Sequence, residues 1–123
     1  EEVEKRWEET AKGVLVLRER VPFVKIVLEY NRARQLEAAG ALDEALEIYL
    51  DNINDDEKVS VGHYERAVTI LETKGEYEKA LELARKAISV KYPKRIMREY
   101  AKRVFAERIE KLEKKFDKVK TER

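Results

Sequence analysis

The feature that most constrains this chain is a twelve-residue pattern that occurs twice, 35 residues apart. Residues 36–47 read LEAAGALDEALE and residues 71–82 read LETKGEYEKALE. Gly40 and Gly75 occupy the same place in both copies. A glycine after an amphipathic stretch suits the left-handed residue that ends a helix. The pattern therefore predicts two copies of a helix, a tight turn and a second helix.

Tyrosines and prolines follow the same spacing. Tyr30 and Tyr64 are 34 residues apart, and Tyr100 follows 36 residues later. Pro22 and Pro93 suit the first turn of a helix, where a missing N–H costs nothing. No stretch shows sustained two-residue alternation. These features predict six helices, over residues 2–19, 22–39, 42–53, 59–74, 77–90 and 93–120.

The first of these helices has an alternative. A spacing of four and three residues along one face favours a helix. Gly13 and the β-branched pair Val14 and Val16 favour a strand over residues 10–20 instead. Both interpretations stay open from the sequence. The residues that carry the helical spacing are Val3, Trp7, Thr10, Val14, Leu17 and Val21.

The repeat resembles the tetratricopeptide repeat (TPR) family, whose unit is 34 residues of helix, turn and helix. In the second copy the residues on the family pattern are Tyr64, Ala67, Leu71, Gly75, Tyr77, Ala80 and Ala87; in the first they are Ala33, Leu36, Gly40, Leu42, Ala45 and Tyr49. Ala84 departs from it, since an aromatic residue is expected there. Asn52 also departs, since it replaces a small residue.

The resemblance implies an all-α, right-handed helical repeat of about two helix-turn-helix units in a single domain, residues 1–123. An N-terminal capping helix would occupy residues 1–21, and the two repeats residues 22–56 and 57–92. Residues 93–123 would form a long C-terminal helix that closes the array, because no glycine near residue 110 ends it.

In this family the first helix of each pair lines a concave groove that holds a peptide. The resemblance therefore implies a polar groove with a basic end, able to hold an acidic peptide through charge-assisted hydrogen bonds. Arg34 and Arg66 stand where chaperone-binding members have asparagines, so that clamp is not reproduced. The candidate groove residues are Tyr30, Asn31, Arg34, Glu65, Thr69, Thr73, Arg98 and Lys102.

Apolar residues continue along the last helix with a heptad-like spacing. They either pack on the chain's own helices or pair with a second copy, which makes a homodimer an alternative. The first helix has a similar seam. The candidate self-association residues are Phe105, Ile109, Leu112, Phe116 and Val119.

Charge is abundant and unevenly placed. Charged residues form 43% of the chain and nearly cancel to a net charge of +1, a composition typical of hyperthermophile or designed proteins. Residues 37–57 hold eight acids and no base, whereas residues 91–123 hold thirteen bases and six acids, or +7. Weak nucleic-acid binding by this basic end is a further alternative, carried by Lys111, Lys114, Lys115, Lys118 and Lys120.

Several classes of function lack support in the sequence. There is no cysteine, and His63 is the only histidine, so we expect no metal or other cofactor. Residues 51–57 lack the central glycine of a calcium loop. No catalytic motif or phosphate-binding glycine loop occurs, so we expect no enzyme. With no apolar run of about 20 residues and no basic leader, a cytoplasmic protein is expected.

These observations predict a protein-interaction or scaffolding module. It would bind a peptide or partner helix of unknown identity in its groove or through its end helices. The main alternative is a structural or designed repeat scaffold that self-associates and has no specific ligand.

Overall fold

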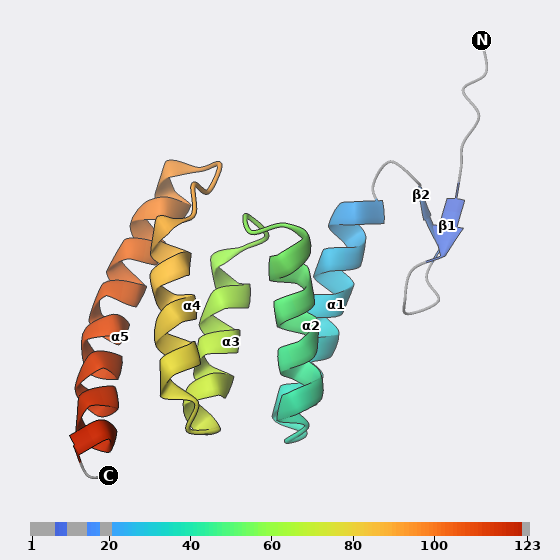
Figure 1. Cartoon of the computed structure of the whole chain (residues 1–123). Coiled ribbons are helices and arrows are strands. Elements are labelled where there is room, and N and C mark those ends of the chain that lie inside the picture. Colours follow the sequence, from blue (N-terminus) through green and yellow to red (C-terminus); the bar gives the residue numbers. More distant parts are fainter. Residues whose placement is uncertain (1–6, 10–14, 18–20, 122–123) are drawn as a thin grey trace. The chain divides into compact units, whose positions relative to one another are not determined.

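Five α-helices account for most of the part of the chain that the structure describes. The computed structural model describes residues 7–9, 15–17 and 21–121, with side chains from residue 24 to residue 118. The α-helical class predicted for the repeat region is confirmed. The helices are α1 (Val21–Ala38), α2 (Leu42–Asp55), α3 (Val61–Thr73), α4 (Tyr77–Ser89) and α5 (Arg95–Thr121), as Figure 1 shows.

The two repeated glycines end α1 and α3 in the same way. Gly40 has a φ angle of 84° and Gly75 one of 78°. The Gly40 N–H donates to the Glu37 carbonyl at 3.0 Å, and the Gly75 N–H donates to the Glu72 carbonyl at 2.9 Å. These are matching left-handed closures of a helix. The tight turns predicted at both glycines are confirmed.

The N-terminal helix predicted over residues 2–19 is wrong for the residues described there. Trp7–Glu9 forms strand β1 and Leu15–Leu17 forms strand β2. The strands pair antiparallel, with Trp7 opposite Leu17. The strand alternative is therefore the one found at residues 15–17, where β-branched Val16 suits a pleated backbone. Residues 1–6, 10–14 and 18–20 lie outside the described part.

The chain divides into two compact units, residues 1–48 and residues 49–123. The first unit contains the β1–β2 pair, α1 and the beginning of α2, and β2 contacts α1 there. The second contains the end of α2 with α3, α4 and α5. The prediction of a single domain over residues 1–123 stays a prediction.

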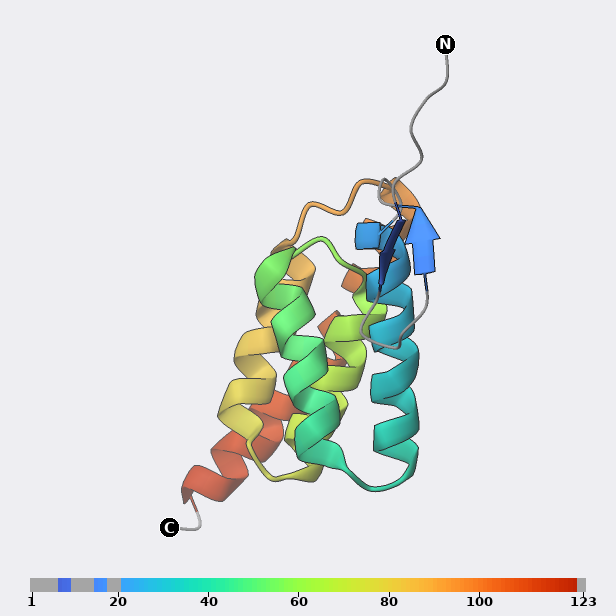
Figure 2. The same ribbon diagram turned by 90° about the vertical axis from the view of Figure 1, so that its right-hand side faces the viewer.

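Within residues 49–123, α4 packs against both α3 and α5. Figures 1 and 2 show these three helices running in alternating directions, so α3 and α5 are parallel. Ala80, Ala84 and Ala87 are fully buried along α4. Small side chains let neighbouring helix backbones approach closely. Larger side chains fill the rest of this core, namely Tyr64, Val68, Ile70, Tyr92, Phe105 and Leu112.

The ends of α3 and α5 follow from local sequence. Ser60 caps α3, because its side-chain oxygen accepts the backbone N–H of His63. α5 continues for 27 residues without a glycine turn. It begins two residues after Pro93, which agrees with the long last helix that was predicted.

Candidate binding surface

The exposed side of α3 carries three of the predicted groove residues. Glu65 and Thr69 are half-buried, and Thr73 is exposed. The Thr69 hydroxyl donates to the Glu65 carbonyl at 2.8 Å, and the Thr73 hydroxyl donates to the Thr69 carbonyl at 2.9 Å. Both threonine hydrogens are thus used inside the helix. The oxygen of Thr69 remains able to accept a hydrogen bond from outside.

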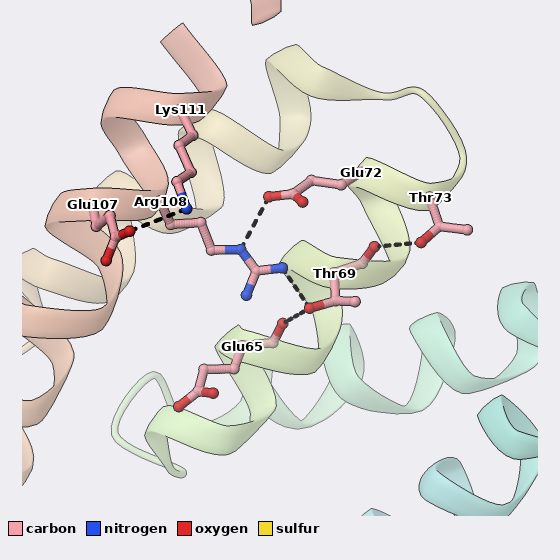
Figure 3. A network of polar contacts seen from close by, with 7 residues as sticks. All are labelled: Glu65, Thr69, Glu72, Thr73, Glu107, Arg108 and Lys111. Carbon is pink, nitrogen blue, oxygen red and sulfur yellow. Dashed lines mark hydrogen bonds and ion pairs between the residues drawn. The ribbon is translucent and has the colours of Figure 1, made fainter. Parts of the chain in front are cut away.

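Arg108 of α5 supplies that bond and joins α5 to α3. Its Nε lies 3.0 Å from Glu72 Oε1, and its Nη2 donates to Thr69 Oγ1 (Figure 3). The side chains of Arg108 and Glu72 are both about three-quarters covered, at 22% and 23% exposed. Partial burial makes this ion pair stronger than a fully exposed one. We call these three side chains the Arg108 network.

Two hollows lie along the same pair of helices. One has a volume of about 560 Å³, and we call it the Ile96 hollow. Its residues are Val61, Ile96, Met97, Glu99, Tyr100 and Arg103. The other has a volume of about 480 Å³, and we call it the Lys111 hollow. Its residues are Glu72, Val104, Glu107, Arg108, Lys111, Leu112, Lys114 and Lys115.

The Ile96 hollow is the more apolar of the two. Ile96 is 72% exposed and Tyr100 is 38% exposed, although both are large apolar side chains. The Arg103 guanidinium lies 5.6 Å from the centre of the Tyr100 ring, a cation–π distance. We call the two hollows and the Arg108 network together the α3–α5 surface.

The predicted groove residues of α5 do not join those of α3. The Arg98 Nη1 donates to the Tyr92 carbonyl at 2.6 Å and so holds the loop before α5. Lys102 is exposed, but at about 100° per residue it lies roughly 120° around the helix from Arg108. The basic end of the groove that was predicted at these two residues is not assembled with Thr69.

The remaining groove residues lie on α1, in the unit formed by residues 1–48. Tyr30 is half-buried there, while Asn31 and Arg34 are exposed. Their part in a groove stays a prediction. An ion pair also lies within α1, where Lys25 Nζ is 3.9 Å from Glu29 Oε1.

The apolar seam of α5 is used largely inside the chain itself. Phe105 is fully buried and Leu112 is 1% exposed. Ile109 and Phe116 are half-buried. The side chain of Val119 lies outside the described residues. Phe105 and Leu112 therefore cannot meet a second copy without leaving the core of residues 49–123.

The basic side chains of the last helix also have neighbours. Lys111 lies 3.0 Å from Glu107, and Lys114 lies 3.3 Å from Glu110. The Lys115 ammonium lies 5.7 Å from the centre of the Tyr77 ring. Ion pairs within one helix reduce the positive charge that this face presents.

A buried polar cluster joins α2 to the start of α3. His63 Nδ1 lies 2.7 Å from Ser60 Oγ, and His63 Nε2 lies 3.4 Å from Asn52 Nδ2. His63 and Asn52 are 2% and 6% exposed. Among the described residues no group of three or more side chains is suited to a metal ion.

Sequence reasoning missed Arg108, Glu72 and the exposed Ile96. The sequence contained one indication of the ion pair, because Glu72 and Arg108 are 36 residues apart, which is close to the repeat period. Side chains one period apart lie on adjacent units of a repeat. Ile96 had no comparable sign, because its exposure depends on which helix covers it.

None of the described helices is both long enough and apolar enough to cross a membrane. No family model, no curated protein and no solved structure matches this chain.

Proposed function

We propose that this chain is a TPR-like helical-repeat module that binds a peptide or a partner helix along its α3–α5 surface. The observation that carries the proposal is the Ile96 hollow, where Ile96 is 72% exposed beside Val61, Met97 and Tyr100. Covering such side chains removes apolar area from water, which favours association.

The Arg108 network supports the proposal by fixing two polar side chains of the Lys111 hollow, Arg108 and Glu72. Arg108 is bonded to two side chains of α3, so its position is fixed before any partner arrives. A pre-ordered surface loses less conformational entropy on binding.

Self-association is not proposed, because two of the five seam residues are inside the chain's own core. Nucleic-acid binding is not proposed either. Lys111 and Lys114 are paired within α5, and Glu107 and Glu110 return negative charge to the same helix. The proposal involves no catalytic step.

The test is selection of binding peptides from a displayed random library on the immobilised chain, followed by affinity measurement against two variants. Ile96→Glu should weaken the selected peptides by about tenfold or more, the loss expected from removal of an apolar anchor. Ala106→Glu is the matched control, since Ala106 is exposed on α5 outside both hollows. Equal binding by the two variants, or the absence of any selected peptide, would reject the proposal.

A further inference from the structure

The Lys111 hollow differs from the Ile96 hollow in its charge. Its cationic residues are Arg108, Lys111, Lys114 and Lys115, and its acidic residues are Glu72 and Glu107. Both acids already have a cation beside them, since Glu72 is bonded to Arg108 and Glu107 to Lys111. The hollow therefore presents an excess of positive charge to a molecule that enters it.

Arg108 has one guanidinium nitrogen left for a partner. Its Nε and Nη2 are bonded to Glu72 and Thr69. Among the contacts of the described residues none uses Nη1, and Figure 3 shows this nitrogen on the side of the guanidinium away from Glu72. Arginine N–H groups form strong hydrogen bonds with carboxylates, because both groups are charged. The two bonds to α3 hold Nη1 in place before a partner arrives, so little entropy is lost in ordering it.

The lysines of the hollow can turn towards a partner at little cost. The side chains of Lys111 and Glu107 are 70% and 72% exposed. Exposed ion pairs contribute little to stability, because water screens them. The Lys115 ammonium lies beside the Tyr77 ring, and no ion pair of Lys115 occurs among the described residues. Both lysines line the hollow together with Arg108, so a carboxylate held there gains two further cations.

The two hollows lie at opposite ends of one surface. On α5, Ile96 and Arg108 are 12 residues apart, which is about 18 Å at the helical rise. On α3, Val61 lines one hollow and Glu72 lines the other, 11 residues further along. A peptide covers such a span with about six residues when extended, or about twelve as a helix.

We propose that the partner of the α3–α5 surface is an acidic peptide with two anchors. An apolar side chain enters the Ile96 hollow, and a side-chain carboxylate about 18 Å further along accepts hydrogen bonds from Arg108 Nη1 and Lys111. This inference rests on the proposed function and names the chemistry of its partner. Nucleic-acid phosphates suit the same cations less well, because the exposed Glu107 repels a continuous backbone of phosphates, whereas a single carboxylate can avoid it.

The first experiment tests the Lys111 hollow alone, by NMR of the full chain. The probe is a hexapeptide of glutamate, acetylated and amidated at its ends, which offers carboxylates without an apolar anchor. We expect it to shift the Arg108 Nε–H and Lys111 amide signals, and the corresponding hexapeptide of glutamine to leave both unchanged. No shift at concentrations up to about 10 mM would overturn the inference.

Two further probes distinguish other sources of negative charge. The glutamine hexapeptide with a free carboxyl end offers a terminal carboxylate alone, and a thymidine hexanucleotide offers phosphates. We expect both to shift the two signals less than the glutamate hexapeptide does. A larger shift with either probe would overturn the assignment to a side-chain carboxylate.

The second experiment uses the peptides selected on the immobilised chain. Exchange of their acidic residue for its uncharged amide should weaken binding to wild type by about tenfold, because a charged hydrogen bond is lost. The same exchange should have little effect on binding to Arg108→Gln. Lys102→Gln is the matched control, because it removes the same charge from an exposed site on another side of α5 and should retain the tenfold effect.

Lys111→Gln keeps the test decisive if Arg108→Gln separates α5 from α3. Its described ion pair lies within α5, so its loss leaves the contact between the two helices in place. Peptides that need Ile96 but bind wild type, Arg108→Gln and Lys111→Gln equally would overturn this inference and leave the proposed function standing. Absence of any selected peptide would instead reject the proposed function itself, even where the glutamate hexapeptide shifts the Arg108 signal.

Discussion

Tyr64 of α3 and Tyr100 of α5 occupy the same place in the repeat, 36 residues apart, in opposite surroundings. Tyr64 is fully buried, its hydroxyl donates to the Glu57 carbonyl, and its ring meets the Tyr92 ring edge-on at 6.4 Å. Tyr100 is 38% exposed and lies under the Arg103 guanidinium. Equal positions in a repeat therefore do not guarantee equal burial.

The neighbouring residues show why the two tyrosines differ. Ala67 and Leu71 lie beyond Tyr64 in the core, whereas Arg103 and Glu107 hold the equivalent places beyond Tyr100 and are exposed. A helix can cover the first pair without burying charge, but covering the second pair would cost the hydration of two ions. The charged residues beyond Tyr100 thus keep this face of α5 in contact with solvent.

We expect the largest difference in the free energy of unfolding when each of the two tyrosine rings is truncated. Tyr64→Ala should lower the free energy of unfolding by about 3–5 kcal/mol, since it leaves a cavity and removes a buried hydrogen bond. Tyr100→Ala should cost less than about 1 kcal/mol. Urea unfolding of both variants measures the two losses. Similar losses would show that the position of a tyrosine in the repeat, and not its burial, sets its contribution to stability.

The second-largest effect is on the pH dependence of the free energy of unfolding. It concerns the residues that directly precede the two tyrosines, His63 in α3 and Glu99 in α5. Burial lowers the folded pKa of His63 to about 4, below the ordinary 6.5, so the unfolded chain binds more protons between these values. Stability is therefore present above about pH 6.5 and is lost as pH falls towards 4.

The expected wild-type loss from this histidine between pH 7.5 and pH 5.0 is about 2 kcal/mol. Glu99→Gln should leave that loss unchanged, because Glu99 is exposed and paired only with Arg95 in the contacts described. Thermal and urea unfolding across this pH range provide the measurement. A smaller loss in the Glu99 variant would mean that the pH effect comes from the surface of α5.

The third comparison concerns the start of each helix. Ser60→Ala should destabilise the chain by about 1 kcal/mol, because α3 loses a side-chain cap that also holds His63. Ile96 is the equivalent residue before Tyr100, and Ile96→Ala should change stability by less than about 0.5 kcal/mol, since it is mostly exposed. Differential scanning calorimetry of the pair would show whether the cap matters more than the exposed side chain.

The smallest effect belongs to the cation–π contact. Arg103→Ala should cost about 0.5 kcal/mol, the usual value at an exposed site. A double-mutant cycle with Tyr100→Leu isolates the coupling between guanidinium and ring. Zero coupling would mean that Arg103 covers Tyr100 without stabilising it.

Much of the local structure could be predicted from the sequence. The helix ends at Gly40 and Gly75, Pro22 in the first turn of α1 and the long α5 all depend on residues close in the chain. Pro93 was predicted in a first turn as well, but α5 begins two residues after it. A glycine accepts a positive φ angle without strain, so a helix end at a glycine can be predicted from neighbouring residues alone. The β1–β2 pair was harder, because a four-three apolar spacing and β-branched residues predict different structures for one segment.

The candidate site was less predictable. Arg108, which donates to the half-buried Thr69, was missed, and Lys102 lies on another side of α5. The groove itself stays a prediction. A repeat period places residues along the sequence, whereas the rotation of α5 about its axis depends on how its buried residues Ala101, Phe105 and Leu112 fit into a core in which α5 packs against α4.

The sequence by itself determined the helices after residue 20 and the turns at Gly40 and Gly75, because hydrogen bonds within a helix and the freedom of glycine act over a few residues. Only the tertiary structure decided that Tyr64 is buried and Tyr100 exposed, that Phe105 and Leu112 serve the chain's own core, and that His63 is enclosed by Asn52 and Ser60. Burial is a property of the neighbours a side chain acquires, and those neighbours come from elements distant in the chain.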